Sequence, residues 1–183
     1  VGRERSVLAV EEALGSGKLI FLAAQCKAQV NEPSEEEIHR VGTVATLVQV
    51  LRYPNETIRL KVQGLARARI ERFHEKKGCY VVRVEVLRDQ ATDVAQSEAV
   101  MRTVRGSFEE DSRLNKKIGH DEMAQIQATE DPSALADLVA GHLGTAKLDD
   151  RQSLLEQTEP LSRLQTVLKL LVSEIEIIQI QRK

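Results

Sequence analysis

The segment that decides the fold of the first half is VGTVATLVQVLR at residues 41–52, followed by YPNE at 53–56 and TIRLKVQ at 57–63. Apolar residues recur at every second position in it, on the first strand as Val44, Val48 and Val50, and on the returning strand as Ile58, Leu60 and Val62. A period of two predicts half-buried β-strands. Proline at the second position of residues 53–56 favours a turn, because its φ angle is already fixed there. The segment therefore predicts an antiparallel hairpin.

The residues before this hairpin predict a short helix and another strand. Ser6 is the expected N-cap of the helix, which carries Val7, Val10 and Leu14 on one face and ends at Gly15 and Gly17. Residues 19–24 are all apolar, which predicts a strand buried on both faces. After a turn at residues 31–33, Ser34 and Glu37 have the spacing of a capping box, and we expect a brief helix there.

The residues after the hairpin predict two further strands, 65–73 and 79–87, joined by a turn at residues 75–78. The apolar face of the last strand consists of Tyr80, Val82, Val84 and Val86. Successive antiparallel strands with short connections predict a meander that curls towards a small barrel.

The second half has the three-and-four spacing of helices. A long helix is expected over residues 94–118, with Val100, Met101, Val104 and Phe108 on its buried side and a stop at Gly119. Asp121 and Asp149 are the expected caps of two short helices, and Asp131-Pro132 starts another that ends at Gly144. The final helix begins at Pro160.

The final helix carries two sets of apolar residues. One set has the spacing of a coiled-coil seam and consists of Leu161, Leu164, Leu168, Leu171, Ile175 and Ile178. The other lies on different faces and consists of Val167, Leu170, Val172, Ile177 and Ile180. Either all of these residues pack inside the bundle, or the distal turns continue into, or pair with, a helix outside the chain.

Composition places the chain among ordinary globular proteins and suggests two domains. Of the 183 residues, 42% are hydrophobic and 30% charged, which excludes a collagen, a disordered tail and a disulfide scaffold. Residues 1–90 carry a net charge of +3 and residues 91–183 a net charge of −5, so we expect a β-domain at 1–90 and a helical bundle at 91–183. Two cysteines and the absence of a secretory signal or an apolar run long enough to cross a bilayer predict a cytoplasmic protein.

No motif in the chain assembles a catalytic, cofactor or metal site. Residues 15–18, GSGK, resemble the end of a phosphate-binding loop, but Leu19 replaces the magnesium-binding Ser or Thr and a helix precedes the loop, so a helix C-cap explains the glycines better. The histidines and cysteines lack the spacing of a zinc site, and no Gly-x-Ser-x-Gly elbow occurs. We therefore expect no catalytic residue, no cofactor and no metal in these 183 residues.

Two surfaces could contact a partner. The turn with Leu51, Tyr53 and Pro54 can expose apolar side chains at a loop tip, where they would contact extended, unfolded polypeptide. A basic sheet face would instead supply phosphate contacts for a stand-alone RNA-binding protein, and consists of Arg59, Lys61, Arg67, Arg69, Arg72 and Arg83. The net charge of −2, the 3% aromatic content and the interleaved Glu71 and Glu85 favour a solvated face without nucleic acid.

An ordered set of motifs resembles the N-terminal region of Lon, the ATP-dependent serine protease of bacteria and organelles. The set consists of VGRERS at 1–6, VGTVA at 41–45, GLARARI at 64–70, LNKKI at 114–118, DPSALAD at 131–137 and SEIEI at 173–177. The resemblance covers nearly the whole chain. It implies an α+β fold in which a PUA-like small β-barrel or sheet domain precedes an all-α helical bundle that ends in a long helix. The apolar strands that precede VGRE in that family have no counterpart in residues 1–183.

The resemblance also implies a function. In that family the N-terminal region recognises unfolded or damaged proteins and helps to hold a homohexamer together. The resemblance therefore predicts a non-catalytic module. Its expected partners are protein substrates and other Lon subunits, and no membrane contact is expected. ATP and magnesium are expected only for the parent protease, whose AAA+ motor and catalytic Ser and Lys have no matching positions in this chain.

Overall fold

The computed structural model describes residues 1–54, 57–115 and 118–181. The chain falls into two compact units, Val1–Arg88 and Asp89–Lys183, which are described separately below. Two of the predicted turn residues, Asn55 and Glu56, lie outside the described residues, as do residues 116–117 of the long helix expected at 94–118.

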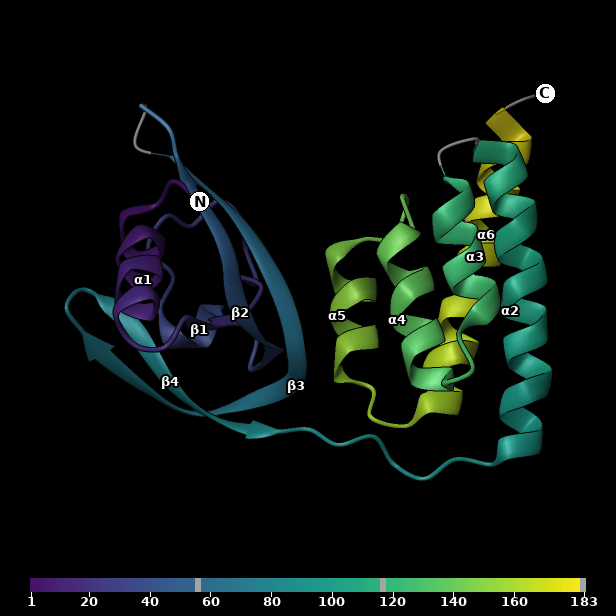
Figure 1. The fold of residues 1–183 in the computed structure, drawn as a ribbon, viewed down its shortest axis with the longest axis horizontal. Helices are drawn as coiled ribbons and strands as arrows, with labels where there is room; N and C mark the ends of the chain where they lie inside the picture. Colours follow the sequence, from purple (N-terminus) through teal and green to yellow (C-terminus); the bar gives the residue numbers. More distant parts are fainter. Residues whose placement is uncertain (55–56, 116–117, 182–183) are drawn as a thin grey trace. The chain divides into compact units, whose positions relative to one another are not determined.

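The first unit contains one antiparallel sheet and a helix (Figure 1). Its elements are α1 Glu4–Gly15, β1 Leu19–Leu22, the 3₁₀ turn η1 Glu35–Glu37, β2 Val41–Arg52, β3 Ile58–Lys76 and β4 Cys79–Val86. The strand order is β1-β2-β3-β4, so the predicted meander is confirmed. Helix α1 buries Val10 and Ala13 against Leu47 of β2, with Ile20, Val50 and Leu60 packed around them.

Three bulges change which side chains β2 and β3 bury. The two strands predicted at 57–63 and 65–73 form the single strand β3, and the pairing registers leave Val48, Leu65 and Glu71 without a partner position. A bulge reverses the alternation of faces, because one residue is added to one strand only. Leu47 and Val50 consequently both pack near α1, whereas Val48 is 54% exposed, so the predicted shared face of Val44, Val48 and Val50 is wrong.

The start of the unit differs from expectation at two points. Helix α1 begins at Glu4 with Arg3 as its N-cap, so Ser6 lies inside the helix and not at its cap. Strand β1 is not buried on both faces, because it is a four-residue edge strand with exposed Leu19 and Leu22. The Ser34–Glu37 pairing is confirmed, since the Ser34 N–H donates to Glu37 Oε2 at 3.0 Å.

The hairpin between β3 and β4 is a two-residue turn. Lys77 and Gly78 both have left-handed φ angles, 52° and 78°, and Lys76 pairs with Cys79. Two successive positive φ angles define the type I′ turn, whose twist matches that of the flanking strands. The turn places Lys76 and Lys77 beside Glu12 of α1, with Nζ–carboxylate distances of 2.5 and 3.3 Å. These two ion pairs connect the helix to this end of the sheet.

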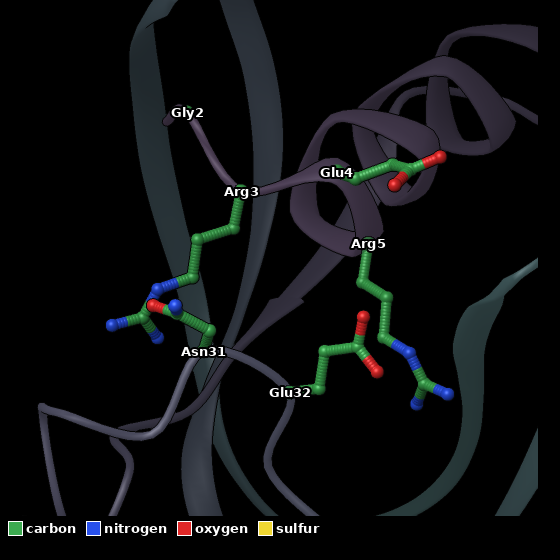
Figure 2. A pocket seen from close by; sticks show the side chains of 6 residues that line it. All are labelled: Gly2, Arg3, Glu4, Arg5, Asn31 and Glu32. Atoms are coloured by element: carbon green, nitrogen blue, oxygen red, sulfur yellow. The ribbon is translucent and has the colours of Figure 1, made fainter.

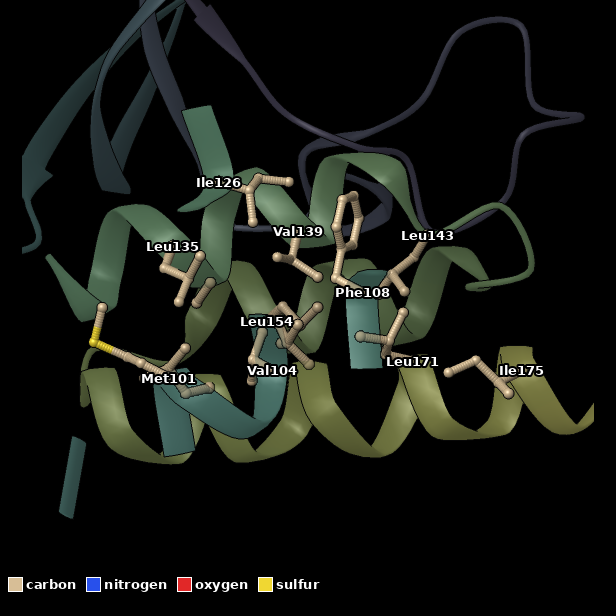
Figure 3. Close-up of a cluster of buried hydrophobic side chains, with 13 residues drawn as sticks. Met101, Val104, Phe108, Ile126, Leu135, Val139, Leu143, Leu154, Leu171 and Ile175 are labelled. Carbon is tan, nitrogen blue, oxygen red and sulfur yellow. The ribbon is translucent and has the colours of Figure 1, made fainter. Parts of the chain in front are cut away.

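The described part of the second unit contains helices and no strand, and the helices surround one hydrophobic core (Figure 3). They are α2 Val94–Asn115, α3 His120–Ala128, α4 Pro132–His142, α5 Leu148–Glu156 and α6 Pro160–Gln181. Phe108 of α2 is fully buried and meets the His142 ring edge-to-face at a centroid distance of 5.6 Å. The α+β fold with a long final helix is therefore confirmed for the described chain.

The predicted helix caps are partly confirmed. Asp131 caps α4 by accepting the Ala134 N–H at 2.6 Å, with Pro132 at the first helical position, and α6 begins at Pro160 as expected. Asp121 and Asp149 are not caps, because the N-caps of α3 and α5 are Gly119 and Lys147, each two residues earlier than predicted. Carboxylates in the first turn satisfy the free N–H groups there, Glu122 for Gly119 at 3.0 Å and Asp150 for Lys147 at 3.1 Å.

Helix α6 buries part of the predicted seam, since Leu164, Leu171 and Ile175 belong to the core and Leu168 packs against it. Its buried residues are Pro160, Arg163, Leu164, Val167, Leu171, Glu174 and Ile175. Val172, Ile177 and Ile180 are exposed, the last by 70%, so the interpretation that every apolar residue of α6 packs inside the bundle is wrong. Pairing of the distal turns with another helix stays a prediction.

Acid should weaken the start of α6 through Glu159. Its Oε2 accepts the Ser162 N–H at 2.6 Å, and its Oε1 accepts the Leu161 N–H at 3.1 Å and the Thr92 hydroxyl at 3.2 Å. These hydrogen bonds, those from Ser162 first, hold the pKa of Glu159 below its ordinary value. The stabilisation is thus present above the unfolded-state pKa, and is lost as the pH falls through the lowered folded-state pKa.

We expect Glu159→Gln to lower the free energy of unfolding at pH 7. The difference from wild type should shrink steadily as the pH falls below the pKa of the unfolded-state carboxyl, ordinarily about 4.3. Urea denaturation at several pH values checks this. Glu98→Gln, which removes an exposed carboxylate on α2, is the control for the loss of one surface charge. A stability difference between Glu159→Gln and wild type that is constant with pH would contradict stabilisation of α6 by the ionised Glu159 carboxylate.

Candidate functional site

Leu51, Tyr53 and Pro54 lie at the distal end of β2, and we call them the tip surface. All three are exposed, Leu51 by 45% and Tyr53 by 43%. The Tyr53 N–H donates to the Thr57 carbonyl at 2.9 Å, which extends the pairing of β2 with β3 beyond Arg52 and Ile58. The apolar side chains are therefore presented on hydrogen-bonded backbone.

The exposure of the tip surface follows from the pairing of the strands. Strand β1 pairs with residues 43–46 of β2, and β4 pairs with residues 68–76 of β3, so neither reaches the distal hairpin (Figure 1). Helix α1 covers the face that carries Val50 and Leu60. Leu51 is the next residue along and points to the other face, opposite Arg59. Within the described β-unit, β1, β4 and α1 leave that face of the distal hairpin exposed.

Two further exposed apolar residues lie on the same two strands. Val48 and Leu65 are each 54% exposed, and both are bulge residues. Sequence reasoning missed them as surface residues, because no residue type at these positions marks the bulge that turns them outwards. They extend the apolar surface available on β2 and β3.

The six basic residues expected on one sheet face do not form one row. Arg59 is in register with Leu51 and Lys61 with Gln49, whereas Arg69 lies opposite Glu85 and Arg72 opposite Arg83. The bulges at Leu65 and Glu71 lie between these groups and reverse the alternation of faces. A continuous track of cations for a phosphate backbone is therefore not formed by this set.

A shallow polar pocket of about 300 Å³ lies beside the start of α1 (Figure 2). It is lined by Gly2, Arg3, Glu4, Arg5, Asn31 and Glu32. The guanidinium groups have partners within the protein: that of Arg3 donates to Gln25 and to the Ala28 carbonyl, and that of Arg5 contacts Glu75 at 3.2 Å and stacks on Tyr80 at 5.0 Å. Charges of both signs line the pocket, so it has no marked preference for an anion or a cation.

The residues considered for chemistry stand apart. No three His, Cys, Asp or Glu side chains of the described chain are grouped to hold a metal. Residues 15–18 are the last residue of α1 and the turn that follows it, where Gly17 has a φ of 90° and the Lys18 N–H donates to the Ala13 carbonyl at 2.8 Å, so the C-cap interpretation is confirmed.

Burial raises the pKa of the Cys79 thiol, which keeps it protonated at neutral pH. None of the helices in the described ranges is both long and apolar enough to cross a membrane.

The family follows from comparison with known proteins. Residues 1–173 match the family model of the ATP-dependent protease La (LON) substrate-binding domain. The chain belongs to this family. It is 40% identical to Lon protease 3 of Sorangium cellulosum over 96% of its length, and 38% identical to the Lon protease of Desulforamulus reducens over its whole length. The matches cover 21% and 22% of those relatives, so this Lon domain spans about a fifth of the curated proteins it resembles.

Solved Lon domains have the same fold. The N-terminal domain of the Mycobacterium avium complex Lon protease superposes with a TM-score of 0.72 at 20% identity, covering 92% of this chain and 86% of that one. The Lon N-terminal domain protein from Xanthomonas campestris superposes with a TM-score of 0.59 at 15% identity, covering 92% and 85%. The resemblance inferred from the ordered motifs is confirmed.

Proposed function

We propose that this Lon substrate-binding domain captures exposed apolar segments of unfolded or damaged proteins on its tip surface and performs no bond-breaking step itself. The observation that carries the proposal is the exposure of Leu51 and Tyr53 at a hairpin end that β1 and β4 do not reach, in a chain of a substrate-binding family. In this proposal the parent is a cytoplasmic ATP-dependent serine endopeptidase, and ATP and magnesium bind outside residues 1–183.

Each domain should bind such a segment weakly. Fully burying one side chain such as Leu51 is worth about 1.5–3 kcal/mol, and an unfolded client loses conformational entropy when it is ordered. Two or three such contacts correspond to a dissociation constant of roughly micromolar to millimolar. We propose that self-association in a homohexamer compensates, because several linked sites raise the effective concentration of client segments at the next site.

Changing the tip surface to polar residues should remove most client binding. We expect the double variant Leu51→Ser/Tyr53→Ser to weaken binding of a permanently unfolded, fluorescently labelled client by about tenfold or more, since two apolar contacts of over 0.7 kcal/mol each are lost. Fluorescence anisotropy with the unfolded client, and with the same client folded, measures this. The folded form should bind more weakly than the unfolded form to the wild-type domain.

Leu148→Ser is the matched control. Leu148 is a leucine with 44% exposure, close to the 45% of Leu51, but it lies at the start of α5 in the helical unit. We expect this variant to bind the client like wild type. Equal weakening in the control and the tip variant, or full binding by the tip variant, would refute the tip surface as the site. Strong binding of single-stranded RNA that falls steeply with salt would instead support a nucleic-acid function.

A further inference from the structure

Arg163, in the first turn of α6, is the most deeply buried cation of the described chain, with 1% of its surface exposed. Its Nη2 donates to Asp89 Oδ1 at 2.7 Å and its Nη1 to Ser133 Oγ at 2.6 Å, while Nε and Nη2 donate to the Gln157 carbonyl at 3.0 and 2.6 Å. Ser133 in turn donates to Asp89. The guanidinium group thus ties the residue that opens the helical unit to α4 and to the α5–α6 loop.

The residues after Asp89 are held by the same loop. The Gln90 N–H donates to the Thr158 carbonyl at 2.9 Å, and the Gln90 side chain donates to Thr158 Oγ1 at 3.1 Å. The Thr92 hydroxyl donates to Glu159 Oε1 at 3.2 Å. Residues 89–92 have no helix or strand of their own, yet they are attached to the helical unit along their length.

On the other side of the junction, the chain is attached to the β-unit. The Leu87 N–H donates to the Arg67 carbonyl at 2.9 Å, which continues the pairing of β4 with β3 by one residue beyond Val86. Arg88 is exposed and lies between the two attachments. We propose that the two units articulate at Arg88 alone, and that Arg163 keeps the joint this short by holding residues 89–92 to the helical unit.

The chemistry of Arg163 suits this role. A guanidinium group offers five N–H donors in a fixed plane, so one side chain can hold a carboxylate, a hydroxyl and a carbonyl at the same time. A buried charge that loses its partners is costly, so the bound arrangement is strongly preferred over one in which Asp89 is released. Releasing the segment would lengthen the free joint from one residue to about five, and would widen the range of orientations open to the β-unit.

Hydrogen exchange at the Gln90 amide tests the attachment. In the wild-type chain we expect this amide to exchange at least about tenfold more slowly than in an unstructured peptide, because its N–H is bonded to Thr158. In Arg163→Met, which keeps an unbranched side chain but removes every donor, protection at Gln90 should fall to near the peptide rate. The amide of Leu171 in the core of α6 reports any global loss of stability.

Glu174→Gln is the matched control. Glu174 is also a buried charge on α6, and it holds the α4–α5 loop by accepting the Gly144 and Thr145 N–H groups at 3.1 and 3.3 Å, away from residues 89–92. It should leave Gln90 as protected as in wild type relative to Leu171. Wild-type exchange at the peptide rate, or equal loss of Gln90 protection in both variants, would overturn the proposal.

A distance measurement tests the articulation itself. Spin labels on the exposed Cys26 and on an introduced Asp149→Cys report on one unit each. We expect the distribution of label distances to be broader in Arg163→Met than in wild type or Glu174→Gln. If Arg163→Met does not fold, Asp89→Asn removes the carboxylate charge and should broaden the distribution in the same direction. A folded variant could lose protection at the Gln90 amide and still give the wild-type distribution of label distances. That result would show that the attachment of residues 89–92 does not limit the relative motion of the two units, and would overturn the proposal.

Discussion

Replacing Phe108 with alanine should unfold the helical unit at much lower denaturant concentration, with a loss of about 3–5 kcal/mol in the free energy of unfolding. Phe108 is fully buried, meets the His142 ring edge-to-face and belongs to the core that joins α2, α3, α4, α5 and α6. Removing the ring leaves a cavity that the surrounding helices fill only in part. Such a loss is a large fraction of the stability of a domain of this size.

The chain itself supplies the means to assign this loss to one unit. Both of its tyrosines, Tyr53 and Tyr80, lie in the β-unit, and there is no tryptophan. Far-UV circular dichroism near 222 nm is dominated by the helices, so its midpoint should shift, whereas the tyrosine fluorescence transition should stay in place. Val94→Ala is the control on the same helix, since Val94 is exposed and should change stability by less than about 0.5 kcal/mol. A joint shift of both signals would show that the two units unfold as one.

Adding a methyl group at Gly42 should damage the β-unit. A Cβ atom there would lie 2.3 Å from the Leu22 carbonyl oxygen and 2.8 Å from Cζ of Phe21, closer than real Cβ atoms approach. The oxygen belongs to backbone that pairs with β2, so β1 would have to move away from its neighbour. We expect Gly42→Ala to cost about 1–3 kcal/mol or more by overpacking, and to shift the tyrosine transition while the helical signal stays in place.

Gly64→Ala is the matched control, because Gly64 is also a strand glycine of the same unit. Its added Cβ would meet only Thr43 Cγ2 at 3.5 Å, which is an ordinary contact. This variant should be neutral or more stable by about 0.5–1 kcal/mol, since alanine loses less conformational entropy than glycine on folding. Wild-type stability of Gly42→Ala would contradict the close approach of β1 and β2. Hydrogen exchange at residues 19–22 would show whether β1 has been displaced.

Local patterns predicted most of the elements because they act over a few residues. The alternation of residues 41–52 and 57–63 predicted two strands, and the Asp131-Pro132 pair predicted the start of α4, each through interactions among neighbours in the chain. The exposed tip surface could be anticipated in the same way, since a proline turn between two strands must lie at the end of a hairpin. Its binding of clients stays a prediction.

Other features depend on partners that are distant in the sequence. Ser6, Asp121 and Asp149 are good caps by residue type, but the helices begin where Arg3, Gly119 and Lys147 meet their hydrogen-bond partners. The exposure of Val48 and Leu65 depends on how β2 and β3 pair. The role of Arg163 in holding Asp89 depends on two residues 74 positions apart in the sequence, which no local pattern reports.

By itself, the amino-acid sequence determined the family, the α+β order of the elements and the positions of most helices and strands, because periodicity, turn residues and ordered motifs are properties of the chain. Only the tertiary structure decided where the bulges fall, which apolar side chains reach the surface and which residues hold the joint between the units. These features depend on strand register and on the burial of groups far apart in the chain. A shift of one residue in the register moves every side chain of a strand to the opposite face of the sheet.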